Sequence, residues 1–435
     1  MFAMFIADLH IHSKYSRATS GKLDLEHLYV WAQKKGLDLI GTGDFTYPQW
    51  FAELEEKLVP EGNGLFKLKD EIARPLQALV PPACRRQVRF ALQTEISNIY
   101  KFGDKVRKVH NVVMFPDLEA AGKFGACLGR IGNVTSDGRP ILGLDSRDLL
   151  EIALECSPET IFIPAHIWTP WFSALGSKSG FDSIEDCYRD LTGHIHAVET
   201  GLSSDPPMNW RVSSLDRFFL ISNSDAHSPD RLGREATLFD CDLSYYEMLN
   251  SMRDGSGVAG TLEFFPEEGK YHLDGHRKCN TRLEPEETLA NDGLCPVCGR
   301  RVTVGVLNRV VQLADRAAGE RGERSRDFSS LLSLDQLIAE CVGVKGRTAR
   351  SVVKVYDQML QTLGPELSIL MELPLEEIGA GPGGTVKTAV ERVRSGHVHL
   401  EGGFDGEFGV VRIFSPEEKK ELPGAKELFF SSQTS

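Results

Sequence analysis

Short apolar runs alternate with amphipathic stretches through roughly the first 240 of the 435 residues. The stretches 23–35 and 145–155 have helical periodicity, and Asp24 and Gly36 are placed to cap the first of them. Strands that alternate with helices predict an α/β fold with a mainly parallel sheet, and seven strands with short connections favour a (β/α)7 barrel. The seven runs are 5–9, 37–41, 88–93, 109–115, 160–164, 197–198 and 218–222.

The connection between the third and fourth runs differs from the others. It has only 13 residues, from Ile96 to Lys108, includes Gly103 and Asp104, and lacks helical periodicity. Because a parallel crossover needs a longer connection, we expect these two strands to form an antiparallel hairpin.

Residue types that bind metals recur where these runs end. Residues two apart on a strand point to the same face, so Asp8, His10 and His12 can converge. Imidazoles and carboxylates bind zinc, manganese or iron, and a bridging carboxylate can hold two ions about 4 Å apart, which suits phosphoester cleavage. A single Asp or His at a strand end is more often a cap or a packed polar group, so the prediction of a metal centre depends on the repetition over six of seven runs. The candidates are Asp8, His10, His12, Asp44, Glu95, His110, His166, Glu199, Asp225 and His227.

Three cysteines, Cys279, Cys295 and Cys298, are grouped in the sequence. The Cys-x2-Cys turn followed by glycine is typical of a structural zinc site, with three packed thiols or a disulfide as alternatives. His276 is the first candidate for the fourth ligand and His272 the second. The segment has almost no core of its own, so the metal would supply its folding energy. The other six cysteines are isolated, which indicates reduced thiols and a cytoplasmic location.

Changes in composition divide the chain into three predicted domains. Residues 1–262 form the barrel, 263–308 the zinc-binding segment, and 309–435 a mainly helical C-terminal domain. No apolar run approaches the roughly 18 residues of a membrane helix, so we expect no membrane contact.

The motifs DLHIH, GTGD, QTE, VHN, PAH and SDAH resemble those of the polymerase and histidinol phosphatase (PHP) superfamily of metal-dependent phosphoesterases. That resemblance implies a distorted seven-stranded barrel with two or three divalent metals, which could be Zn, Mn or Mg, and catalysis by Asp225, His10, Glu95 and His166. It implies that Glu199 does not bind a metal itself but orients a residue that does. Phe45 follows Asp44 where many relatives have histidine. The implied ligand sets are His10, His12, Glu95 and Asp225 for one metal, Glu95, His110 and His166 for a second, and Asp8, Asp44 and His227 for a third.

A PHP barrel followed by GKYHLDGHRKC and CPVCGRRVTVGVLNRV closely resembles the endonuclease Q family. That resemblance implies a DNA repair endonuclease that nicks DNA on the 5′ side of deaminated bases (uracil, hypoxanthine, xanthine) or abasic sites. Water activated by the metals would attack and leave a 3′-hydroxyl and a 5′-phosphate. The alternatives are a PHP-type DNA exonuclease and a small-molecule phosphomonoesterase.

The net charge of −13, from 49 Lys and Arg against 62 Asp and Glu, argues against a general polyanion binder. Basic residues nonetheless gather in local patches, and aromatic residues near the predicted metals could stack a flipped base or simply pack at the barrel mouth. The candidate DNA contacts are Lys105, Lys108, Lys345, Arg347, Arg350, Tyr15, Phe45, Trp168, Trp171 and Phe172.

The tail contains Lys426-Glu-Leu-Phe-Phe430, which resembles the short motifs that dock bacterial sliding clamps. A terminal strand that packs on the rest of the protein is the commoner role for such a segment. A sliding clamp is therefore a second predicted partner besides DNA with deaminated bases.

Overall fold

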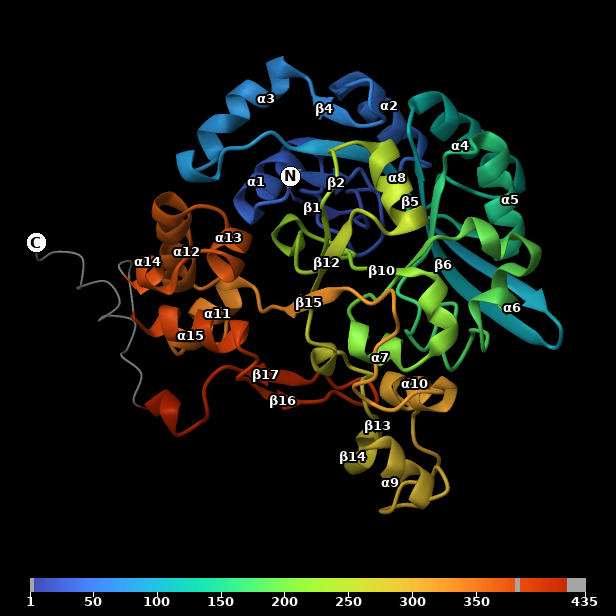
Figure 1. Ribbon diagram of the computed structural model, residues 1–435, viewed down its shortest axis with the longest axis vertical. Coiled ribbons are helices and arrows are strands. Elements are labelled where there is room, and N and C mark those ends of the chain that lie inside the picture. The colour runs from blue at the N-terminus through green and yellow to red at the C-terminus, as the bar shows by residue number, and fades with distance from the viewer. Residues whose placement is uncertain (1–3, 380–383, 421–435) are drawn as a thin grey trace, which may run out of the picture.

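The structure is a computed structural model that describes residues 4–379 and 384–420. A mixed sheet of eleven strands lies at its centre, with helices outside it and a second group of helices beside β15 (Figure 1). The predicted clamp-docking segment, Lys426–Phe430, lies outside the described residues. Within those residues, no helix has the length and apolar character needed to cross a membrane.

All seven predicted strands are present, five of them in the main sheet. β9 (Ala197–Glu199) and β10 (Phe219–Ile221) pair with each other in parallel. β6 (Lys105–Phe115) and β7 (Ile141–Leu142) pair with β5, and β8 (Ile161–Pro164) pairs with β6. The order of the other strands is β15 (Asp327–Ser330), β12 (Val258–Glu263), β11 (Ala236–Phe239), β1 (Phe5–Asp8), β2 (Leu39–Gly41), β5 (Arg89–Phe102), β4 (Phe66–Leu68) and β3 (Leu58–Pro60).

The sheet is mixed, which corrects the expectation of a mainly parallel one. β1, β2 and β5 are parallel to one another, but β11 is antiparallel to both β1 and β12. β5 and β6 form the predicted hairpin, with paired residues from Leu92–Phe115 to Phe102–Lys105. Two single hydrogen bonds, from Ile167 N to Glu199 O and from His12 N to Ala226 O, bring β9 beside β8 and the end of β10 beside the end of β1. The ends of the seven predicted strands therefore surround one site.

The helices between these strands begin and end at the expected signals. Asp24 accepts a hydrogen bond from His27 N at the start of α1 (Leu25–Lys35), and Gly36 ends it with a left-handed φ of 97°. The others are α2 (Pro48–Lys57), α3 (Asp70–Leu76), α4 (Leu118–Ile131), α5 (Ser146–Cys156), α6 (Ile184–Tyr188), α7 (Pro206–Trp210) and α8 (Tyr245–Asp254).

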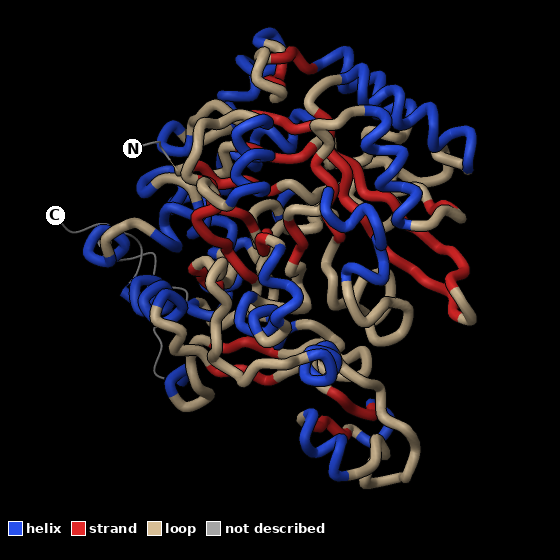
Figure 2. Tube along the Cα trace, turned by 45° about the vertical axis from the view of Figure 1, so that its right-hand side comes forward, coloured by secondary structure: helices blue, strands red, loops and turns tan. Residues whose placement is uncertain are grey.

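The second half of the chain forms a small lobe and a helical group. The lobe, which projects at the bottom of Figure 2, contains the hairpin of β13 (Asp274–His276) and β14 (Thr281–Leu283), followed by α9 (Pro285–Ala290). The remaining elements are α10 (Val306–Leu313), α11 (Leu334–Cys341), α12 (Arg350–Leu363), α13 (Glu366–Met371), α14 (Leu375–Gly379), α15 (Gly384–Arg394), β16 (His399–Glu401) and β17 (Val410–Arg412).

The helical group is joined to the first part of the chain in two ways. β15 extends the main sheet by pairing with β12. Glu366, at the start of α13, forms a buried ion pair with Lys35 of α1 at 2.7 Å. It also accepts hydrogen bonds from the Tyr356 hydroxyl and from Leu334 N. Because a buried carboxylate with an unpaired oxygen is costly, this full set of partners fixes the helices against α1.

Candidate metal centre and nucleic-acid groove

Four side chains, one on β5 and three in the segments that follow β1 and β10, converge at one place. His10, His12, Glu95 and Asp225 each offer a ligand atom, and these atoms all lie within 4.8 Å of one another. His12 Nε2 lies 3.0 Å from Asp225 Oδ1 and 3.3 Å from Glu95 Oε2. The buried Nε2 of His10 has no hydrogen-bond partner among the described residues, although Glu95 Oε1 is 3.6 Å away. An unpartnered imidazole nitrogen that faces two carboxylates suits a divalent metal.

A second group shares Glu95 with the first. His110 Nδ1 lies 2.6 Å and His166 Nε2 3.2 Å from Glu95 Oε1, whereas Glu95 Oε2 faces His12. Glu95 therefore lies between the two groups, with Oε1 facing His110, His166 and, at 3.6 Å, His10, and with Oε2 facing His12. A carboxylate shared in this way is suited to bridge two metals.

The ligand histidines are held from behind by other polar groups. Glu199 accepts hydrogen bonds from His10 Nδ1 at 3.0 Å and from the backbone N–H of His166 at 2.8 Å, and Asn223 donates to it at 2.9 Å. Asp44 Oδ1 lies 3.1 Å from His12 Nδ1. Such partners fix the tautomer and ring orientation of a metal-binding histidine.

The third predicted set is not brought together among the described residues. Asp8 uses both oxygens to accept backbone hydrogen bonds, from Ser224 N at 3.0 Å and Gly233 N at 2.9 Å. Asp44 is occupied by His12, Ser13 and Ser16. His227 contacts the His12 ring at 4.6 Å between centroids, but belongs to neither cluster. Asp8 and Asp44 therefore have a visible role in positioning loops and His12.

The backbone is strained at the site. Asp44, His166 and Asp225 have φ values of 46°, 29° and 46°, in the left-handed region that residues with a Cβ rarely adopt. Strain of this kind persists only where the surrounding structure imposes it, and it is concentrated at functional sites.

Electrostatics keep the carboxylates ionised. Burial raises the pKa of Glu95, but the charges of His110, Arg139 and His10 outweigh it and hold the pKa well below its usual value. The same balance, with His12 and His10 as partners, lowers the pKa of Asp225. Burial, the largest of the influences on it, lowers the pKa of His110 to about 4.

Arg139 is a residue of this site that the sequence analysis missed. Its Nη1 lies 2.9 Å from Glu95 Oε2, yet 44 residues separate the two in sequence. Arg139 follows an irregular segment rather than a strand-like run, so no periodic signal marks it.

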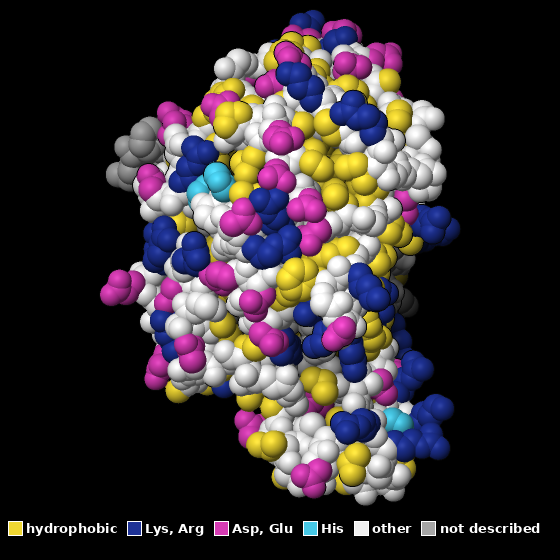
Figure 3. Space-filling model, turned by 90° about the vertical axis from the view of Figure 1, so that its right-hand side faces the viewer, with side chains coloured by type: hydrophobic (Ala, Val, Ile, Leu, Met, Phe, Trp, Pro, Cys, Tyr) yellow, Lys and Arg dark blue, Asp and Glu magenta, His cyan; other side chains and the backbone are white. Residues whose placement is uncertain are grey.

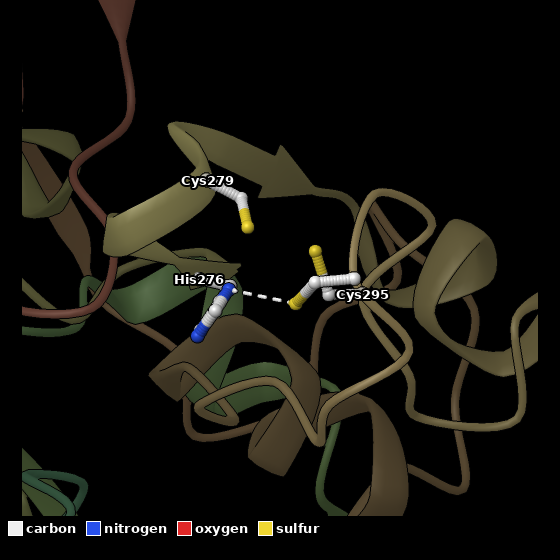
Figure 4. A group of neighbouring side chains, drawn as sticks. His276, Cys279 and Cys295 are labelled. Atoms are coloured by element: carbon white, nitrogen blue, oxygen red, sulfur yellow. Dashed lines mark hydrogen bonds between the residues drawn. The ribbon is translucent and has the colours of Figure 1, made fainter.

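The grouped cysteines form a separate cluster in the lobe. The side chains of His276, Cys279 and Cys295 point toward a common centre (Figure 4), and with Cys298 their ligand atoms lie within 4.8 Å of one another. His276 Nδ1 is 3.5 Å from Cys298 Sγ, whereas His272 is outside the cluster and buried beneath Gly305 and Gly402. Cys279 packs on the small core of Leu283, Cys295 and Val302. This donor set fits a tetrahedral zinc ion, with His276 rather than His272 as the fourth ligand.

A groove of about 1380 Å³ opens beside the metal centre, and Phe172 and Thr169 connect the two. The Phe172 ring lies 4.8 Å from that of His110, and Thr169 Oγ1 lies 3.2 Å from His166 Nδ1. Seven Lys or Arg line the groove against two Glu, a difference of five positive charges. The basic residues are Arg231, Arg234, Lys270, Lys345, Arg347, Arg412 and Lys419, and the aromatic ones are Trp171, Phe172, Phe264, Tyr271 and Phe408.

The predicted DNA contacts differ in where they lie relative to this groove. Trp171, Phe172, Lys345 and Arg347 line it, and Lys108 Nζ lies 5.2 Å from the centre of the Phe172 ring. Lys105 and Arg350 are exposed outside its lining, and Tyr15 is partly buried and stacks on Tyr47.

Trp168 and Phe45 require correction. Trp168 is fully buried, with its indole N–H bound to Asn209, and Phe45 packs against Phe115 and Phe124 in the core. Neither ring is accessible for stacking on a base. Phe45 directly follows Asp44, and Trp168 comes two residues after His166, but their side chains point into the core rather than the groove.

The lobe adds further positive charge. In Figure 3 the dark blue Lys and Arg side chains gather on the lobe at the bottom of the view. Arg277, Lys278, Arg300 and Arg301 are exposed there. Positive charge at the metal centre's groove and on the lobe offsets the acidic balance of the whole chain.

Two solved structures match nearly the whole chain. The crystal structure of the lesion-specific endonuclease PfuEndoQ from Pyrococcus furiosus is 29% identical, with a TM-score of 0.81 over 97% of this chain and 100% of that one. A structure of endonuclease Q with a 27-mer duplex substrate that has an abasic lesion at the active site is 30% identical, with a TM-score of 0.80 over 96% of this chain and 98% of that one.

Sequence comparisons agree. The family model of the MJ0043 C-terminal domain matches residues 333–397. The uncharacterized protein YqxK of Bacillus subtilis is 26% identical over 93% of this chain and 98% of its own length. The uncharacterized protein MJ0043 of Methanocaldococcus jannaschii is 30% identical over 62% of this chain, and the aligned part spans 34% of that longer protein.

Proposed function

The chain belongs to the endonuclease Q family of PHP-type metal-dependent phosphoesterases, and from this premise we propose that it is a DNA repair endonuclease. It nicks the phosphodiester on the 5′ side of deaminated bases or abasic sites and leaves a 3′-hydroxyl and a 5′-phosphate. The observation that carries the proposal is a cluster of shared carboxylate and imidazole ligands that opens, through Phe172 and Thr169, onto a basic groove lined with aromatic residues.

The first two ligand clusters would hold two divalent metals, with Glu95 between them. Metals bound there would neutralise the scissile phosphate and lower the pKa of the attacking water. Glu199 and Asp44 accept the Nδ1 protons of His10 and His12, which leaves each Nε2 free to act as a ligand. His276, Cys279, Cys295 and Cys298 would hold a structural zinc ion.

The groove supplies a means of recognising damaged DNA. Lysines and arginines would contact phosphates, which gives affinity but no sequence preference. A deaminated base must leave the duplex to be read, and exposed aromatic rings such as Trp171 and Phe408 are available to stack on bases beside it. Selectivity would then depend on how easily the lesion is extruded rather than on the surrounding sequence.

A nicking assay tests the proposal. End-blocked duplexes that contain one uracil, hypoxanthine or abasic site, with undamaged duplexes as controls, would be incubated with Mn²⁺, Mg²⁺ or chelator. We expect a single metal-dependent nick 5′ to the lesion, with a ligatable 5′-phosphate. Cleavage at every position of undamaged duplexes would indicate a general nuclease, and phosphate release from simple monoesters without nicking would indicate a phosphatase.

A further inference from the structure

The segment between α4 and β7 brings a basic side chain over the metal centre. Its backbone is anchored at several points: Asp137 accepts hydrogen bonds from Arg17 N and Arg139 N, Gly138 N donates to Tyr15 O, and Pro140 O accepts from Ser97 N. The bonds to Arg17, Tyr15 and Ser97 attach the segment to the loop that follows His12 and to β5, which carries Glu95. The position of the segment is therefore fixed relative to the metal centre.

Gly138 is essential for this close approach. A Cβ atom at this position would lie 2.5 Å from Asp44 Oδ2 and 2.6 Å from Ser16 Oγ. Asp44 in turn holds His12. Only glycine lets the backbone pass this close to the group that orients His12, and the next residue, Arg139, is consequently directed at the centre.

Arg139 contacts the carboxylate that the two clusters share. Its Nη1 lies 2.9 Å from Glu95 Oε2, while its side chain remains 26% exposed. Arginine has five N–H donors in a planar fork, and among the described residues Arg139 uses its side chain only for Glu95. Donors therefore remain for a ligand that reaches the centre from solvent.

We propose that Arg139 binds a non-bridging oxygen of the scissile phosphate and stabilises the negative charge that builds up on it during cleavage. This inference rests on the metal-dependent phosphodiesterase chemistry proposed above. A phosphodiester bound at Glu95 and its two clusters would lie beside the exposed edge of the Arg139 fork, whose geometry matches phosphate oxygens. A guanidinium held rigidly beside developing charge stabilises it without reorganisation at the moment of reaction.

The alternative role for Arg139 is structural: it could serve only as the counter-ion that keeps Glu95 in place. The two roles predict different behaviour when the guanidinium is removed. If Arg139 only holds Glu95 in place as its counter-ion, removing the guanidinium lowers the affinity of the site for metal. If Arg139 binds the phosphate, removing the guanidinium leaves metal affinity unchanged or raises it, because a positive charge that competes for Glu95 is gone. Phosphate binding is then weaker and cleavage is slower.

The test compares Arg139→Met and Arg139→Lys with Arg17→Met as the matched control. Arg17 pairs with Asp137 at 3.4 Å on the same segment, but its side chain is 74% exposed and does not contact Glu95. Mn²⁺ affinity is measured by competition with a chromogenic chelator, and binding of inorganic phosphate to the Mn²⁺-loaded protein by calorimetry. Turnover is measured on bis(p-nitrophenyl) phosphate and on a uracil duplex.

We expect Arg139→Met to slow turnover about 100-fold, as removal of one charge-stabilising donor does, and to weaken phosphate binding while Mn²⁺ affinity is maintained. Arg139→Lys should recover part of both losses, and Arg17→Met should match the wild type on the small phosphodiester. Loss of Mn²⁺ affinity in Arg139→Met, or phosphate binding equal to that of Arg17→Met, would overturn the proposal. If the wild type fails to nick lesion DNA but shows this dependence on phosphate and the small diester, the repair function falls and the role of Arg139 stands.

Discussion

The two candidate metal sites are built in opposite ways. Glu95 on β5 and His10 and His12, just after β1, are completely buried beside a large sheet. Glu199, itself bound by Asn223, holds His10 through a hydrogen bond, and Asp44 holds His12. The Cys279–Cys298 cluster lies in a lobe with a core of only a few residues, and Cys298 is exposed. The fold positions the ligands at the first site, whereas at the second the metal would hold the fold together. Loss of each metal should therefore have a different consequence.

The strongest test of this contrast is Asp225→Asn. Asparagine keeps the shape of the side chain and tolerates the left-handed φ of 46°, but it removes the charge that a metal needs. We expect nicking to fall by at least about 1000-fold, as when a residue that acts as part of a catalytic unit is lost, with little change in the melting temperature measured in chelator. Asp230→Asn, at a half-exposed position of the turn 229–231, is the control. Nicking that persists in Asp225→Asn would exclude the proposed ligand set.

Replacing the exposed thiol of the other cluster should give the reverse pattern. Cys298→Ser should release zinc and unfold the lobe, because little apolar surface is available there to replace the metal. Hydrogen exchange should rise in β13, β14 and α9 but not in the main sheet, and turnover of bis(p-nitrophenyl) phosphate should change less than about twofold. Affinity for duplex DNA should fall roughly tenfold, as expected for the loss of a few phosphate contacts. Cys127→Ser, at a cysteine outside the cluster, is the control, and a protected lobe in Cys298→Ser would refute the zinc assignment.

The same contrast explains what the sequence could and could not predict. The apolar runs that precede His10, Glu95 and Asp225 carry regular local signals in the sequence, as does the short β5–β6 connection, although β5 continues past Glu95. The strands β11 and β12 were missed because each depends on pairing with a distant neighbour. Side-chain direction was also not predictable: Trp168 and Trp171 are three residues apart, yet the first is buried and the second lines the groove. Arg139 was missed because an irregular segment carries it to Glu95.

A moderate effect, on DNA binding, is expected from substitutions in the groove that opens beside the metal centre. Lys345 and Arg347 line it without contacting the metal centre. The double variant Lys345→Ser/Arg347→Ser should weaken binding to damaged and undamaged duplexes alike and reduce the slope of log affinity against log salt by about two. Turnover at saturating DNA should be maintained. Lys123→Ser/Arg130→Ser on α4, outside the groove, is the control, and an unchanged salt slope would place the DNA elsewhere.

The smallest effect on turnover is expected at a buried carboxylate that contacts neither metal site. Glu263 of β12 is fully buried, with Ser222 and Thr200 as hydroxyl partners at 3.1 and 3.2 Å. Burial raises its pKa from an ordinary 4.5 to about 8, whereas the pKa of Glu95 is lowered, because among the described residues no cation pairs with Glu263 as Arg139 does with Glu95.

The raised pKa of Glu263 predicts the direction in which the free energy of unfolding changes with pH. The folded protein holds the proton of Glu263 more tightly than the unfolded chain does, so the contribution is fully present below about pH 4.5 and is lost as pH rises towards 8. Glu263→Gln cannot titrate, so its free energy of unfolding relative to the wild type should rise between pH 5 and 8, by an amount on the order of a few kcal/mol. Urea unfolding at several pH values measures this, with the exposed Glu185→Gln as control. Parallel pH profiles for Glu263→Gln and the wild type would show that the carboxylate is ionised in the fold, and a loss of nicking would show that it belongs to the catalytic site after all.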